Sequence, residues 1–120
     1  MICIISGGFK EYILPVAARL GLPDCPVYAN TFVWKEDGTI AGADPNNPMA
    51  HAGGKVNVLR SMTLPYPVTV IGDGYTDYEI KQAGLAASFW LFTENCCRSQ
   101  LIPLADRVLN SLDDLFLTHP

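Results

Sequence analysis

The run Val68-Thr69-Val70-Ile71, which ends at Gly72, constrains the fold of this chain more than any other feature. The run is nearly continuous in apolar or β-branched residues, whereas a strand with one solvated face alternates apolar and polar residues. It therefore predicts a strand buried on both faces, with Ile71 inside. Residues 2–5 form a second apolar run, which ends at Ser6-Gly7-Gly8 and predicts a similar strand.

Helical patterns separate the apolar runs along the whole chain. Helices are expected over residues 9–20, 55–62, 76–83 and 112–117, and further strands over residues 27–34, 87–92 and 107–109. Asp37-Gly38 predicts a small hairpin that turns the chain toward Thr39-Ile40. This alternation predicts an α/β fold of one domain over residues 1–120, with a mainly parallel sheet flanked by helices.

Composition excludes several classes of protein. Of the 120 residues, 49% are hydrophobic and 17% are charged, which excludes a disordered chain. The net charge is −4 and the basic residues are scattered, so no nucleic-acid partner is expected. No apolar stretch is long enough to span a membrane and no signal peptide is recognisable, so a cytoplasmic location is expected. The four cysteines lack metal-ligand spacing and are expected to be reduced thiols.

Three groups of polar residues follow strands or begin helices, where open α/β sheets bind ligands. In Ser6-Gly7-Gly8, a hydroxyl and backbone N–H groups meet the start of a helix, a combination that suits an anion. The alternative is a tight turn in which Ser6 caps the helix. Lys55 begins a helix, where a cation is mildly unfavourable unless a bound phosphate compensates it; the alternative is a solvated surface lysine.

Asp73 and Asp77 flank the turn after the buried strand, in Gly72-Asp73-Gly74-Tyr75-Thr76-Asp77. Two carboxylates at such a turn attract a hard cation such as Mg²⁺. Helix capping would explain Asp77 without a metal, but it would not explain Asp73. Taken together, the three groups predict a site for a phosphate and its Mg²⁺.

These residues match a known family. Ile4-Ile5-Ser6-Gly7-Gly8-Phe9, Lys55 and Val70-Ile71-Gly72-Asp73-Gly74-Tyr75-Thr76-Asp77 resemble motifs two, three and four of haloacid dehalogenase (HAD) superfamily phosphatases. Asn30-Thr31-Phe32 and Phe92-Thr93-Glu94-Asn95 further resemble the phosphoserine phosphatase branch. The resemblance implies a three-layer Rossmann-like core. It also implies that Ser6 and Gly7 bind the substrate phosphate, that Lys55 binds the phosphate and acts in catalysis, and that Asp73 and Asp77 bind Mg²⁺.

The family's first motif, Asp-x-Asp-x-Thr, does not occur among these 120 residues. In the family this motif supplies the nucleophile and the general acid, and a substrate-selecting cap follows it. The chain is therefore expected to be the C-terminal part of a Mg²⁺-dependent phosphomonoesterase acting on a small phosphorylated metabolite. It is expected to be inactive by itself, because covalent catalysis cannot start without its nucleophile.

The family's first strand lies centrally, between the strands that carry Ser6 and Asp73. Its absence is expected to leave a gap of about 10 Å in the sheet. Residues 2–5 and 68–71 are therefore expected to pair directly, or to accept a strand from a second copy or from another chain.

Two other classes of function remain open on the sequence. One is a non-catalytic module that binds phosphate and Mg²⁺, alone or as a subunit completed by another chain. The other is a CheY-like or flavodoxin-like domain, which the sequence disfavours because the first strand has no acidic cluster and no Ser/Thr-rich phosphate loop follows it.

Overall fold

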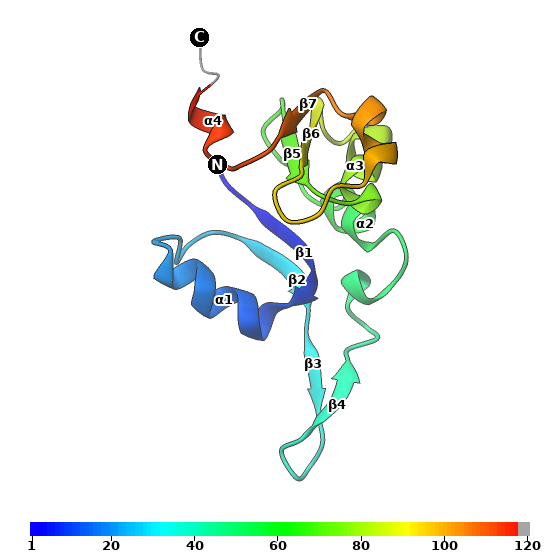
Figure 1. Cartoon of the computed structure of the whole chain (residues 1–120). Coiled ribbons are helices and arrows are strands. Elements are labelled where there is room, and N and C mark those ends of the chain that lie inside the picture. Colours follow the sequence, from blue (N-terminus) through cyan, green and yellow to red (C-terminus); the bar gives the residue numbers. More distant parts are fainter. Residues whose placement is uncertain (118–120) are drawn as a thin grey trace. The chain divides into compact units, whose positions relative to one another are not determined.

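The computed structural model describes residues 1–117 and divides the chain into two compact units, Met1–Val58 and Leu59–Pro120. Figure 1 shows the elements of both. Each unit is described below by itself. The single domain expected over residues 1–120 stays a prediction.

The first unit contains a parallel pair of strands, a hairpin and a helix. Its elements are β1 (Ile4–Phe9), α1 (Lys10–Arg19), β2 (Val27–Asn30), β3 (Phe32–Trp34), β4 (Ile40–Ala43), the 3-10 helix η1 (Pro48–Ala50) and the start of α2 (Gly54–Arg60). Strands β1 and β2 are parallel, and α1 packs against both (Figure 1). Strands β3 and β4 are antiparallel, which confirms the expected hairpin.

The second unit is a parallel sheet in the order β5-β6-β7. Its elements are β5 (Thr69–Gly72), α3 (Tyr75–Gln82), β6 (Ser88–Phe92), the 3-10 helix η2 (Ser99–Leu104), β7 (Arg107–Leu109) and α4 (Asp114–Leu117). Helix α3 packs against β5 and β6, and Ile80, Phe89, Leu91 and Leu109 are fully buried. Since three of the four strand pairs in the described residues are parallel, the expected mainly parallel α/β architecture is confirmed.

Several expected boundaries and one expected burial differ from the structure. Strand β1 continues through the glycines to Phe9, and the strand expected over residues 27–34 is interrupted at Thr31. Ile71, expected inside, is 40% exposed, while its neighbour Val70 is buried. The expectation of a strand buried on both faces was therefore wrong, because the elements of its own unit leave one side of β5 exposed at Ile71.

Strands β1 and β5 each have a hydrogen-bonded neighbour on one edge. Among the described strands, β1 pairs with β2 and β5 pairs with β6. Direct pairing of these two strands was one of the two expected responses to the missing first strand, and it stays a prediction because the two strands belong to different units. The other response, a strand accepted from another copy or another chain, stays a prediction.

The described helices are short. α1, with 10 residues, is the longest α-helix within residues 1–117, and Pro15 lies inside it without ending it. No helix in this part of the chain has the length and apolar character needed to cross a membrane.

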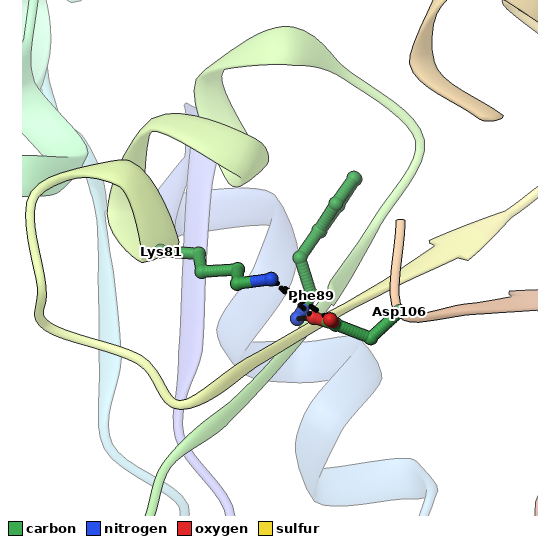
Figure 2. A network of polar contacts seen from close by, with 3 residues as sticks. All are labelled: Lys81, Phe89 and Asp106. Atoms are coloured by element: carbon green, nitrogen blue, oxygen red, sulfur yellow. Dashed lines mark hydrogen bonds and ion pairs between the residues drawn. The ribbon is translucent and has the colours of Figure 1, made fainter. Parts of the chain in front are cut away.

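A network of hydrogen bonds around Asp106 links three parts of the second unit (Figure 2). Both carboxylate oxygens of Asp106 accept hydrogen bonds of 2.8 Å from Lys81 Nζ on α3, and Oδ2 also accepts one of 2.8 Å from the Phe89 N–H on β6. The hydrogen bond from Lys81, followed by that from the Phe89 N–H, lowers the pKa of Asp106 from its ordinary value. One side chain thus ties the turn before β7 to α3 and β6.

Candidate functional site

Ser6, Gly7 and Gly8 form a bulge in β1 beside the start of α1. Ile5 pairs with Tyr28 and Phe9 pairs with Asn30, so three residues of β1 lie opposite a single residue of β2. The bulge leaves Gly7 and Gly8 exposed. Such bulges interrupt the ladder and free backbone groups for other partners.

The Ser6 hydroxyl does not cap α1. The N-cap is Phe9, which provides no side-chain hydrogen bond, and Ser6 Oγ instead accepts a hydrogen bond of 3.0 Å from the Gly8 N–H. The capping role that the sequence left open for Ser6 is therefore not found. An α-helix whose N-terminus lacks a side-chain cap keeps backbone N–H groups and a positive dipole end that suit an anion.

Lys55 is the second residue of α2, and a close backbone contact fixes where α2 begins. A Cβ on Gly54 would lie 2.5 Å from Pro48 O and 2.9 Å from Met49 Cα, both in η1. Gly53, with φ of 72°, has a conformation that glycine adopts without strain. These two glycines place the start of α2 directly on η1, with Lys55 half-buried beside it.

Asn47 connects η1 to β2. Its Nδ2 donates hydrogen bonds of 2.8 Å to Ala29 O and 3.3 Å to Thr31 Oγ1, and its Oδ1 accepts one of 2.9 Å from the Met49 N–H. η1 also contacts β1, the strand that carries Ser6. Ser6, Gly7 and Lys55 thus belong to one packed unit. The convergence of their side chains on a single phosphate remains a prediction.

Asp77 caps helix α3 in the second unit. It is 6% exposed, and its Oδ2 accepts a hydrogen bond of 3.1 Å from the Gly74 N–H. A Cβ on Gly72 would overlap the Asp77 carboxylate, so only glycine leaves room for that side chain. The structural role weighed for Asp77 in the sequence is therefore present, and it fixes this carboxylate next to the end of β5.

Asp73 lies on the outside of the same turn, next to Arg98. Arg98 Nη1 donates a hydrogen bond of 2.7 Å to Asp73 O and lies 3.8 Å from Asp73 Oδ1. Both side chains are about half exposed, so the ion pair contributes little to stability. Arg98 braces the backbone of the turn and leaves the carboxylate accessible from solvent.

The two carboxylates suit Mg²⁺ in their chemistry but provide only part of a coordination shell. Mg²⁺ prefers oxygen ligands and is commonly held by one or two carboxylates together with water and a substrate phosphate. Within residues 1–117, no three His, Cys, Asp or Glu side chains gather in one place. Asp73 is about half exposed and Asp77 is buried next to the end of β5, and both carboxylates are compatible with the predicted site. Their binding of Mg²⁺ stays a prediction.

Replacement of Gly72 by alanine is expected to displace the Asp77 carboxylate. Because the new Cβ occupies the space of that side chain, we expect a loss of about 1–3 kcal/mol in the free energy of unfolding. Chemical denaturation would measure it. The matched control is Gly74→Ala, whose Cβ would lie at an ordinary 3.6 Å from Asp77 Oδ2. Equal losses in the two variants would show that Asp77 does not depend on Gly72.

Comparison with known proteins shows which family the chain belongs to. The chain is 35% identical to the chloroplastic phosphoserine phosphatase of Arabidopsis thaliana, over 92% of its own length and 41% of that protein. It is 39% identical to the phosphoserine phosphatase of Mus musculus, over 63% of the chain and 35% of that protein. The chain belongs to the phosphoserine phosphatase-like branch of the HAD superfamily.

A solved structure agrees with this membership. The crystal structure of a phosphoserine phosphohydrolase-like protein from Francisella tularensis superposes on this HAD chain with a TM-score of 0.77 and 31% identity, covering 98% of this chain and 55% of the other. No protein-family model matches the chain. The HAD chain thus spans about two fifths of the Arabidopsis relative. The HAD fold also sets aside the CheY-like and flavodoxin-like alternatives.

The site contains residues that the sequence analysis did not single out. Asn47 holds η1 and Arg98 braces the turn at Asp73, while Asn30, which holds the glycine bulge, was noticed only as part of the resemblance. A polar Asn30 at the end of the apolar stretch Val27-Tyr28-Ala29 was the available signal. Asn47 gave no such signal, because its loop is rich in polar residues.

Proposed function

We propose that this chain is the phosphate- and Mg²⁺-binding part of a phosphomonoesterase, with phosphoserine as its substrate. The observation that carries the proposal is the glycine bulge of β1, which brings the Ser6 hydroxyl and the exposed Gly7 backbone to an uncapped helix start. The names of the Arabidopsis and mouse relatives support phosphoserine as the substrate.

The chain's own residues bind and orient the phosphate. Ser6 and the Gly7 N–H donate hydrogen bonds to its oxygens, and the Lys55 ammonium offsets their negative charge. Asp73 and Asp77 would hold Mg²⁺, which when bound would supply positive charge. The carboxylate nucleophile comes from outside these 120 residues, because the sequence contains no Asp-x-Asp motif.

A strand from another polypeptide segment pairs with the open edge of β1 or of β5. The support is that β1 and β5 are each paired on one edge within the described residues. Edges of this kind readily accept another strand. The added segment would belong to a second copy of the chain or to a separate chain. The proposed location is the cytoplasm, although the Arabidopsis relative is named as chloroplastic.

The proposal is tested by titrating the 120-residue chain with inorganic phosphate and with Mg²⁺ while recording its backbone amide NMR signals. Phosphate is expected to shift the signals of Gly7 and Gly8, and Mg²⁺ those of Asp73 and Gly74. Ser6→Ala is expected to weaken phosphate binding by about tenfold, because it removes a hydrogen bond to a charged group.

Asp73→Asn is expected to weaken Mg²⁺ binding by a similar factor, because it removes a charged ligand. Asp113→Asn is the matched control, since Asp113 is exposed and lies outside the site. Shifts scattered over the chain, or a Ser6→Ala variant that binds phosphate as well as the unaltered chain, would overturn the proposal. If phosphate and Mg²⁺ bind but no added segment ever supports hydrolysis, the chain is instead a non-catalytic binding module.

A further inference from the structure

Asn30, the last residue of β2, lies opposite the glycine bulge. Its side chain is 8% exposed, and its Nδ2 donates a hydrogen bond of 3.0 Å to Gly7 O. Its Oδ1 is buried and has no hydrogen-bond partner among the described residues. One half of this amide therefore holds the bulge, and the other half is unsatisfied.

The unsatisfied oxygen makes Asn30 a poor choice for stability alone. A buried acceptor without a partner lowers the stability of the folded chain. The Gly7 carbonyl that Asn30 binds belongs to an exposed residue, so water could donate a hydrogen bond to it instead. An apolar side chain of similar volume would avoid the cost. The position of Asn30 is therefore better explained by what it does to the bulge than by what it adds to the core.

The hydrogen bond to Gly7 O also orients the Gly8 N–H. The two groups belong to one peptide unit, and that peptide is trans, so they point in opposite directions. With the carbonyl held toward Asn30, the N–H points the other way, where it donates its 3.0 Å hydrogen bond to Ser6 Oγ.

The Ser6 hydroxyl is oriented in turn. A hydroxyl has one proton to donate and two lone pairs that accept. Because one lone pair of Ser6 Oγ accepts the Gly8 N–H, the proton of Ser6 points away from Gly8 and remains available to a ligand. A Cβ on Gly8 would lie 3.2 Å from Ser6 Oγ, so the space around this hydroxyl is already tight.

We propose that Asn30 is a positioning residue that fixes the Gly7–Gly8 peptide and thereby directs the Ser6 hydroxyl proton at an oxygen of the bound phosphate. The inference rests on the proposed function, because it assumes that a phosphate binds at the bulge. It adds a buried residue that does not touch the phosphate and acts through two successive hydrogen bonds.

The decisive variant is Asn30→Leu, which removes both the Nδ2 donor and the Oδ1 acceptor of the amide while keeping a similar volume. We expect its melting temperature to equal or exceed that of the unaltered chain, because the unsatisfied Oδ1 is gone. We expect its affinity for inorganic phosphate, measured by NMR titration, to fall by about tenfold. A residue with a purely structural role would give the opposite pattern, with stability lost.

Asn30→Asp adds a pH readout. An ionised carboxylate cannot donate to Gly7 O, whereas a protonated one can, so the variant should bind phosphate poorly at about pH 8 and regain affinity toward about pH 5. The ratio of its dissociation constant to that of the unaltered chain is compared at each pH, which cancels the titration of phosphate itself. Asn46→Asp, an exposed site in the same unit, is the charge control.

Three outcomes decide the matter. If Asn30→Leu binds phosphate as tightly as the unaltered chain, the inference is overturned. It is also overturned if the loss of phosphate affinity is accompanied by a loss of stability. If the unaltered chain binds no phosphate, the proposed function fails. The inference is then tested by hydrogen exchange of the Gly8 amide, whose protection should be lower in Asn30→Leu than in the unaltered chain. Unchanged protection of Gly8 would overturn it.

Discussion

The purified 120-residue chain is expected to show negligible turnover of phosphoserine, even with saturating Mg²⁺. Its sequence carries the groups assigned to binding but no Asp-x-Asp motif to supply a nucleophile. Binding groups alone retain part of an enzyme's rate enhancement, yet loss of the nucleophile in covalent catalysis typically costs about 10⁶-fold. Continuous phosphate release with phosphoserine as substrate is the measurement.

Hydrolysis of phosphoserine is expected to appear in a chimera. The segment of the Arabidopsis relative that precedes its matched region would be fused ahead of this chain, since the match covers only 41% of that protein. The fusion should hydrolyse phosphoserine, and Asp73→Asn within it should abolish hydrolysis. Steady turnover by the unextended chain, abolished by the same substitution, would show that these 120 residues contain a nucleophile that the sequence does not reveal.

The local elements could be predicted because their signals are local. Asp37-Gly38 formed the expected hairpin, and the helix expected over residues 112–117 is present as α4 (Asp114–Leu117), with Ser111 three positions before Asp114. In that last case Asp114 Oδ2 accepts hydrogen bonds from the Ser111 and Asn110 N–H groups. Turn and cap chemistry needs only a few neighbouring residues, so one sequence is sufficient to reveal it.

The burial of Ile71 could not be predicted in the same way. A run of β-branched residues indicates a strand, but burial depends on which strands and helices come to lie against it. In this chain β5 is paired only with β6 among the described strands, and Ile71 is 40% exposed.

The role of Asn30 was hidden for a related reason. Its contact with Gly7 O joins residues 23 positions apart and depends on the register of β1 against β2, in particular on the bulge. A sequence shows that an asparagine ends an apolar stretch but not which carbonyl lies opposite. Asp77 is a different case, because the sequence does single it out. Helix capping and metal binding both favour a carboxylate at this position, so the sequence alone does not separate the two roles.

Gly54→Ala is expected to be among the most destabilising single substitutions in the first unit. The added Cβ would lie 2.5 Å from Pro48 O and 2.9 Å from Met49 Cα, and backbone atoms cannot swing aside as the end of a long side chain can. Either η1 or the start of α2 must move. We expect a loss of about 3 kcal/mol, or roughly 10 °C in melting temperature, and weaker phosphate binding because Lys55 moves with α2.

Gly53→Ala is the matched control for that contact, because it changes the adjacent residue by the same methyl group. Its Cβ would meet nothing closer than 3.9 Å, at Asn57 Nδ2, so its cost comes from the φ of 72° alone and should be about 1–2 kcal/mol. The difference between the two variants measures the contact of α2 with η1. If Gly54→Ala were no more destabilising than Gly53→Ala, that contact would not fix Lys55, and another contact would have to hold the lysine at the site.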